Sequence, residues 1–203
     1  MSKRARGKVD MEERILETTD RLFYGKGIRA IGVDTIAAET GISKRTLYNY
    51  FTSKDALIAA YLTRRIRPIA ASDAPAAEQI LAVFERLERT FASRGFRGCP
   101  FVNAVAELGE HPARTIAANF KESRRLWFRE KLTALGVRDP DGLAIQLSLL
   151  VDGAIAAALV RGDAAMAGAA QEAARTLLLS AGIRLGSARK RGRRRSAHRS
   201  SAP

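Results

Sequence analysis

Hydrophobic residues recur along most of the chain at the three- to four-residue spacing of amphipathic helices. In the first series, Ile15, Leu22 and Phe23 share one helical face, and Gly25 and Gly27 follow as a C-terminal stop signal. No segment shows the alternation of polar and apolar residues that is typical of a strand. The pattern therefore predicts an all-α protein of about nine helices. They are expected at about residues 10–24, 34–40, 43–50, 53–62, 75–91, 100–108, 111–135, 140–160 and 164–183.

Residues that can cap helices precede several of these segments. Asp34, Ser43 and Ser53 are each expected to cap a short helix of the N-terminal third. Asp73 and Pro75 mark the start of the first longer helix. These signals place the helix starts more narrowly than the hydrophobic spacing does.

Segment 34–51 meets the requirements of a helix-turn-helix. Ala37 is small enough for two helices to cross, and Gly41 tolerates the positive φ of the turn. The apolar residues that would hold both helices against a third are Ile36, Ile42, Leu47 and Tyr50. Phosphates and base edges in a major groove suit the residues that the second helix exposes, which are Lys44, Arg45, Thr46, Tyr48 and Asn49. A three-helix fragment without a role in DNA binding would have the same spacing and is the alternative.

Positive charge is concentrated at the two ends of the chain. The 203 residues include 35 Lys and Arg against 21 Asp and Glu, a net charge of +14. Residues 1–67 carry 14 basic and 8 acidic residues, residues 68–184 carry 14 and 13, and residues 185–203 carry 7 and none. A nearly neutral centre between basic ends favours contact with a polyanion at the ends and another task in the middle. The alternative for the C-terminal tail is a purely solubilising role.

The residues needed for catalysis or metal binding are scarce. The only imidazoles are His111, expected to cap a helix, and His198 in the basic tail. Cys99 is the only cysteine, so an internal disulfide is excluded, and a buried apolar role is favoured over redox sensing. We therefore expect no enzyme, no metal site and no cofactor. The longest uncharged apolar run, residues 153–160, is shorter than the roughly 20 residues of a membrane span, so no membrane segment is expected.

Five segments resemble the DNA-binding domain of TetR-family transcriptional regulators: residues 15–23, 25–27, 35–37, 41–51 and 53–57. The resemblance implies an all-helical bacterial homodimer that binds a palindromic operator in double-stranded DNA. It also implies release of that DNA when a small-molecule effector enters the C-terminal domain.

The resemblance and the exposed helical face together nominate nine DNA contacts. They are Thr35, Ser43, Lys44, Arg45, Thr46, Tyr48, Asn49, Tyr50 and Lys54. By the resemblance, Lys54 and the tyrosines mainly contact phosphates. Arg45 stands where many family members have Gly or Pro, so its role, on a guanine or on a phosphate, stays open.

The C-terminal half resembles the family more weakly, at residues 97–108 and 149–154. In the family, the last two helices form a four-helix bundle with those of a second subunit. Here both helices are rich in Ala and Gly, which permits close helix approach, and a homodimer through these helices is expected. The alternative is an ordinary intramolecular core.

Aromatic and isolated polar residues of the central helices could line an effector pocket. The candidates are Phe84, Phe91, Phe101, Asn103, Glu107, Phe120, Trp127 and Asp152, and ordinary core packing is the alternative for each. Buried carboxylates at Glu107 and Asp152 would favour a cationic or hydrogen-bond-donating effector.

Four regions are therefore expected. They are a basic N-terminal arm at 1–9, a helix-turn-helix domain with a linking helix at 10–67, a ligand-binding and dimerisation domain at 68–184, and a disordered basic tail at 185–203. The expected protein is a cytoplasmic repressor that binds an operator as a homodimer and leaves it when the effector binds. The alternatives are an activator, a regulator that ignores small molecules, or a nucleoid-type DNA-binding protein.

Overall fold

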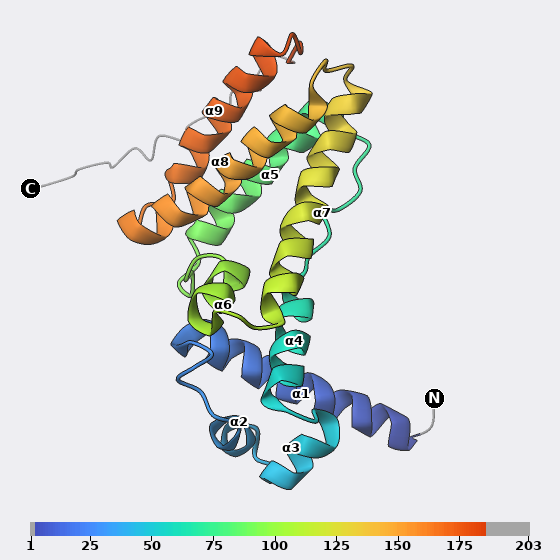
Figure 1. The fold of residues 1–203 in the computed structure, drawn as a ribbon, viewed down its shortest axis with the longest axis vertical. Helices are drawn as coiled ribbons and strands as arrows, with labels where there is room; N and C mark the ends of the chain where they lie inside the picture. The colour runs from blue at the N-terminus through green and yellow to red at the C-terminus, as the bar shows by residue number, and fades with distance from the viewer. Residues whose placement is uncertain (1–2, 186–203) are drawn as a thin grey trace, which may run out of the picture.

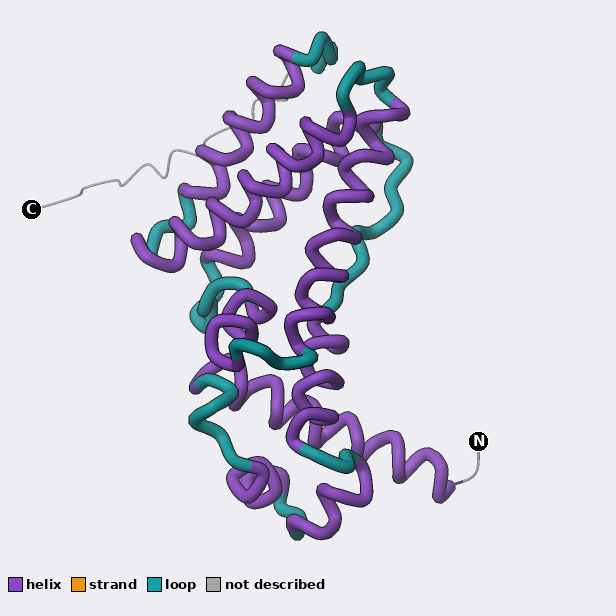
Figure 2. Tube along the Cα trace, viewed as in Figure 1, coloured by secondary structure: helices purple, strands orange, loops and turns teal. Residues whose placement is uncertain are grey.

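The computed structural model describes residues 3–185, with side chains from Gly7 onward. This part of the chain contains nine α-helices and no strand, which confirms the predicted all-α fold (Figures 1 and 2). The helices are α1 (Lys3–Lys26), α2 (Val33–Thr40), α3 (Lys44–Tyr50), α4 (Lys54–Arg65), α5 (Ala76–Phe91), α6 (Pro100–Leu108), α7 (Ala113–Ala134), α8 (Pro140–Arg161) and α9 (Met166–Ser180).

Capping side chains mark the starts of three helices, α3, α4 and α8. Ser43 accepts a hydrogen bond from the backbone N–H of Thr46, and Ser53 accepts one from Ala56, as predicted. The prediction for Asp34 is wrong, because Gly32 occupies the N-cap of α2 and Asp34 lies in the first turn. A carboxylate there still favours the helix through the helix dipole.

Two ends of the chain differ from expectation. Helix α1 begins at Lys3, so most of the separate arm expected at 1–9 is part of this helix. Helix α9 ends at Ser180, before Gly182 with a positive φ of 81°, whereas the prediction extended it to about 183. Residues 1–2 and the basic tail from 186 lie outside the described residues.

The apolar side chains form two clusters rather than one. The lower core joins α1–α4 to α6 and the first turns of α7, through residues such as Leu47, Tyr61 and Phe101. The upper core joins α5, the last turns of α7, α8 and α9, through residues such as Phe84 and Phe128. The expected domain boundary at 67/68 therefore does not separate the two cores. Helix α6 and the start of α7 come after this boundary in the sequence but pack with α1–α4 in the lower core (Figure 1).

Helix α8 is long and apolar enough, by length and composition, to cross a membrane, with a mean hydropathy of 2.1 over 18 residues. In the fold it packs against α5, α7 and α9, and it buries Leu143, Leu147 and Val151 in the upper core. Its Asp152 forms ion pairs with two side chains of α7. These contacts are those of a core helix in a helical bundle.

One face of α8 and α9 leaves large apolar side chains in solvent. Leu149 is 64% exposed and Val160 is 85% exposed. Other residues of these two helices with exposed apolar side chains are Ile145, Leu159 and Leu179. Because soluble proteins seldom leave large apolar side chains clustered in water, this face is suited to contact another surface.

Candidate functional site

The turn between α2 and α3 has the geometry that the sequence predicts. Gly41 adopts a left-handed conformation with φ 73° and ψ 35°, and the N–H of Ile42 returns to the carbonyl of Ala37. Ile36 and Leu47 are completely buried against the helices behind them. Arg14 of α1 adds a hydrogen bond of 3.1 Å to the carbonyl oxygen of Thr40. Helix α2 is therefore held against α1, and α3 is held by the turn and by Leu47 in the lower core.

Helix α3 presents its polar face outward, at the end of the molecule opposite α8 and α9 (Figure 1). The exposed candidates of the interface are Thr35, Ser43, Lys44, Arg45, Tyr48 and Asn49. Thr46 and Tyr50 are half-buried, and the Thr46 hydroxyl lies 2.8 Å from that of Ser43. Lys44 forms an ion pair of 3.1 Å with Asp34 of α2, an exposed pair that a phosphate can displace at small cost.

Lys54 lies differently from the other candidates. Its Nζ donates a hydrogen bond of 2.8 Å to the carbonyl oxygen of Ile28 and sits 5.9 Å from the centre of the Phe23 ring. Burial lowers the pKa of Lys54, and the charges of Glu107 and Asp55 partly offset this effect. One donor of this ammonium thus holds the connection between α1 and α2, which leaves its other two for a phosphate.

A cavity of about 860 Å³ lies between the two cores. Its walls come from α1, α4, the connection from Ile66 to Ile69, α5, the segment from Phe96 to Phe101, α7 and α8. The connection between α4 and α5 runs beside α7 (Figure 2). The cavity is thus bounded by elements that are distant in the sequence.

Half of the residues nominated for an effector pocket line the cavity. Phe91, Phe101, Phe120 and Trp127 line it, and the rings of Phe101 and Phe120 stack with their centres 4.0 Å apart. Phe84 does not reach it, because its side chain is completely buried in the upper core.

The three polar nominees lie outside this cavity. Asn103 donates a hydrogen bond to the carbonyl of Arg97, and Glu107 accepts one of 3.0 Å from the N–H of Arg29. Asp152 forms ion pairs with Lys121 and Arg124. Glu107 and Asp152 are only partly buried and already have protein partners, so the burial on which the expectation of a cationic effector depended is incomplete, and that expectation stays a prediction.

Five arginines line the cavity, and sequence reasoning missed all of them. They are Arg64, Arg65, Arg67, Arg86 and Arg124, and the only acidic residue in the lining is Asp20. The helical spacing could have pointed to two of these arginines, Arg86 and Arg124. In α5, Arg86 lies three residues after Val83 and next to Leu87, and in α7, Arg124 lies between Phe120 and Trp127. Arg124 thus shares a helical face with two residues nominated as lining, whereas Arg86 shares one with Val83, which was not nominated.

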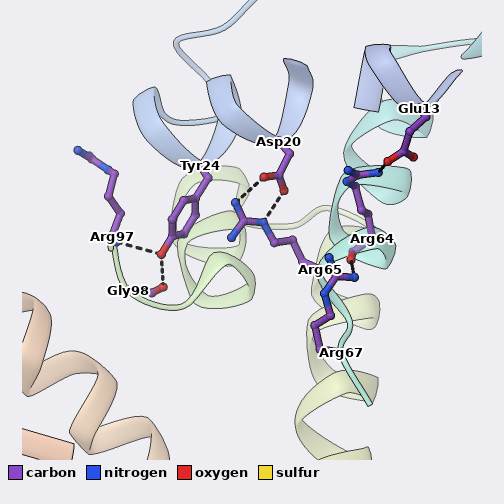
Figure 3. A network of polar contacts seen from close by, with 8 residues as sticks. All are labelled: Glu13, Asp20, Tyr24, Arg64, Arg65, Arg67, Arg97 and Gly98. Carbon is purple, nitrogen blue, oxygen red and sulfur yellow. Dashed lines mark hydrogen bonds and ion pairs between the residues drawn. The ribbon is translucent and has the colours of Figure 1, made fainter. Parts of the chain in front are cut away.

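A polar network joins α1, α4 and the start of α6 at the edge of the cavity (Figure 3). Arg65 of α4 forms a two-pronged pair with Asp20 of α1, and its guanidinium stacks 4.0 Å from the centre of the Tyr24 ring. The Tyr24 hydroxyl donates to the carbonyl of Gly98 and accepts from the N–H of Arg97, each at 2.9 Å. These contacts connect the helix that precedes the helix-turn-helix to the wall of the cavity.

A second pair in Figure 3 joins Glu13 of α1 to Arg64 of α4. The hydrogen bond from Arg64 lowers the pKa of Glu13, and the same bond raises the pKa of Arg64. Among the residues that the structure describes, Arg67 donates only to the carbonyl oxygen of Arg64, at 2.6 Å.

His111 and Cys99 both lie where elements of the lower core meet. His111 accepts a hydrogen bond of 3.0 Å from the N–H of Ala113 through Nδ1, which is the expected capping role at the start of α7. Cys99 is 8% exposed and packs in the lower core beside the cavity. Within residues 3–185, no cluster of three or more His, Cys, Asp or Glu residues could hold a metal ion.

Comparison with known proteins supports the interface from an independent direction. The family model for bacterial regulatory proteins of the tetR family matches residues 15–61, which contain α2, α3, the second half of α1 and most of α4. The chain is 44% identical over 55 residues to an uncharacterized HTH-type transcriptional regulator of Mycobacterium tuberculosis. That match spans 27% of this chain and only 27% of the relative.

Two solved structures resemble the chain over nearly their whole length. A TetR-family transcriptional regulator from Streptomyces coelicolor is 31% identical, with a TM-score of 0.79, and the match covers 86% of this chain and 97% of that one. A TetR-type transcriptional regulator from Streptomyces avermitilis is 35% identical, with a TM-score of 0.72, covering 86% and 99%. Both likenesses include the C-terminal helices as well as the helix-turn-helix.

Proposed function

The chain belongs to the TetR family of bacterial transcriptional regulators, with a DNA-binding helix-turn-helix, and from this premise we propose that it is an effector-controlled repressor. In this proposal, two copies bind a palindromic operator, and a small molecule in the cavity releases them. The observation that carries the proposal is the connection of the exposed helix α3, through the lower core, to a cavity in the same molecule.

The recognition surface is the exposed face of α3, with Thr35 of α2 beside it. Arg45, Tyr48 and Asn49 have free side chains at the tip of the molecule and are assigned to base edges and nearby phosphates. Lys44 and Lys54 are assigned to phosphates, since each ammonium already has a partner that restricts its direction. The side chains of Ser43, Thr46 and Tyr50 are close enough to the same surface to assist.

The dimer is assigned to the exposed apolar face of α8 and α9. Small residues let these helices approach one another closely, while Leu149 and Val160 extend into solvent. A two-fold axis through this face would place the two α3 helices on the same side of the dimer. A palindrome with half-sites about 34 Å apart requires that arrangement.

Release follows from the position of α4. This helix carries Lys54 at its DNA end and Arg65 at the cavity, so a shift in its axis would change the separation of the two recognition helices. An effector that reverses the population from 1:99 to 99:1 must bind the released state about 10⁴-fold more tightly. A weaker preference produces partial release.

The first experiment is sequencing of genomic fragments captured by the purified protein at near-physiological salt, where non-specific binding is weak. The proposal expects a palindromic consensus near a few promoters. Tyr48→Ala should abolish enrichment of that consensus. The control Arg89→Ala removes an exposed residue of α5, far from α3, and should leave the consensus unchanged.

Other outcomes point to the alternatives. Uniform, salt-sensitive capture without a consensus would mean a nucleoid-type protein whose basic residues bind any sequence. A consensus whose removal lowers expression of the neighbouring gene would mean an activator.

A further inference from the structure

The cavity between the cores has one apolar wall. Phe101 and Phe120 form a stacked pair there, and Phe91, Trp127 and Ile155 extend the apolar surface. At about 860 Å³ the cavity is within the range of sites for small organic molecules. An apolar body of one or two rings, or a medium alkyl chain, would be buried by this wall.

The remaining lining is cationic. Five arginines face one carboxylate, Asp20, which is already bound by Arg65. Arg64 has its partner in Glu13, outside the cavity lining. Among the described side chains, Arg67 and Arg86 have no carboxylate partner. The cavity therefore has an excess of positive charge even after every ion pair is counted.

Arg124 carries the clearest sign of a missing partner. Its side chain is only 10% exposed, and its Nη2 donates to Asp152 at 2.7 Å. Its Nε, however, is fully buried and has no hydrogen-bond partner. A buried guanidinium donor without an acceptor is costly, because it has lost its hydrogen bonds to water without replacement. No water-sized probe reaches this atom, so a bound molecule could accept from it only after the Arg124 side chain shifts toward the cavity.

We propose that the cavity takes an amphipathic organic anion, in which a carboxylate or a similar acidic group is attached to an apolar body. The acidic group meets Arg86, Arg124 and the arginines after α4, and the body lies on the aromatic wall. Guanidinium groups suit this role because they bind carboxylates through two parallel hydrogen bonds. This inference rests on the proposed effector site and specifies the chemistry of its ligand.

The same geometry suggests how the anion reaches the DNA-binding helices. Arg65 joins α4 to α1 through Asp20, and Arg64 joins them through Glu13 (Figure 3). An anion beside these arginines competes with both carboxylates for the same donors. Binding would thus loosen the attachment of α4 to α1 at the end next to the cavity.

The test uses three probes that share one alkyl chain and differ in charge: decanoate, decan-1-ol and decylammonium. Trp127 is the only tryptophan and lines the cavity, so its fluorescence reports binding to the full-length protein without DNA. We expect decanoate to bind at least about tenfold more tightly than decan-1-ol, a difference of about 1.4 kcal/mol. Decylammonium should bind most weakly, because the arginines of the lining repel its positive charge.

The controls separate the cavity from the overall charge of +14. Arg86→Gln should weaken decanoate binding at least about tenfold and leave decan-1-ol unchanged, since it removes a charge without leaving a carboxylate unpaired. Arg86→Lys should restore part of the affinity. Arg89→Gln removes the same charge from an exposed position on the same helix and should have no effect.

Three results would overturn the inference. One is equal or tighter binding of decan-1-ol or decylammonium, and another is an equal loss in Arg86→Gln and Arg89→Gln. The third is no binding of any probe up to about 1 mM, the concentration that corresponds to about −4.1 kcal/mol. Operator release is measured separately, so decanoate that binds through Arg86 without releasing the operator supports the ligand class and rejects release by this site.

Discussion

The lower and upper cores are of similar size but differ in how much of their apolar surface is covered. The lower core buries large side chains such as Phe23, Tyr61 and Leu47, and hydrogen bonds from Arg14 and Lys54 to backbone carbonyls hold its helices in place. The upper core packs alanines between α8 and α9 and leaves an apolar face in water.

The proposed function accounts for this difference. A DNA-reading surface must keep α3 rigid, which demands a closed core directly behind it. A dimer surface must leave apolar area uncovered until a second copy arrives. The cavity lies where the closed core meets the open one, so a ligand there contacts both.

The largest expected effect comes from opening the lower core. Leu47→Ala removes a completely buried side chain of α3 and should cost about 2–5 kcal/mol of unfolding free energy, because it leaves a cavity. Denaturant unfolding measures this loss. DNA binding should disappear, while dimer formation, measured by sedimentation, should persist because α8 and α9 belong to the upper core.

The control for this change is Leu126→Ala. Leu126 is 44% exposed on α7, so its truncation should alter stability by less than about 0.5 kcal/mol. Loss of the dimer in Leu47→Ala, or equal destabilisation by both substitutions, would contradict the independence of the two cores.

The next effect tests the open face of the upper core. Leu149→Arg places a charge in the proposed dimer contact, where Leu149 is 64% exposed in the single chain. The dimer dissociation constant should rise by at least about 100-fold, or about 2.8 kcal/mol, because the charge must be desolvated. Sedimentation equilibrium measures this change. Val102→Arg, at a 51% exposed apolar position on α6, should leave dimerisation unchanged, and an equal effect there would rule out the α8–α9 face.

A smaller effect concerns Gly98, which lies just before α6 and lines the cavity between the two cores. Gly98 has a φ of 79°, and a Cβ at this position would lie 2.9 Å from Cδ2 of Leu159. Gly98→Ala should therefore cost about 1–2 kcal/mol through backbone strain, with some addition from the contact. Thermal unfolding measures the loss. A Cβ at Gly95, three residues earlier, would meet no atom within 4 Å, so Gly95→Ala should be tolerated. Equal losses of stability in the two variants would show that the positive φ of Gly98 does not matter.

The smallest effect concerns an exposed ion pair within α7, between Arg125 and Glu122. A hydrogen bond from Arg125 lowers the pKa of Glu122, so this pair stabilises the fold at neutral pH and loses its contribution as the pH falls below about 4. Glu122→Gln should slightly reduce the melting temperature at pH 7, and this reduction should shrink steadily as the pH is lowered below about 4. Glu88→Gln, an exposed change on α5, serves as control, and a reduction that does not shrink with falling pH would contradict this reading.

Most of the helix-turn-helix could be predicted from the sequence. Its signals are local: Ser43 and Ser53 cap the helices that immediately follow them, and Gly41 makes the turn between its neighbours. Asp34 shows the limit of such reasoning, because it and Gly32 are both acceptable at the start of α2 and only the packing chooses between them.

The cavity could be predicted only in part. The aromatic positions Phe91, Phe101, Phe120 and Trp127 were nominated because they stand on apolar helical faces. The polar nominees Glu107 and Asp152 were misplaced, since nothing local shows that Arg29 and Arg124 would be their partners.

The sequence by itself determined the helices, the Ser43 and Ser53 caps and the polar face of α3, because these depend on residues within a few positions of one another. Only the tertiary structure decided that α6 joins the lower core and that five arginines from three helices and one connection surround a single cavity. Those contacts join residues far apart in the sequence, and their energy depends on which apolar faces pack against one another in the folded chain.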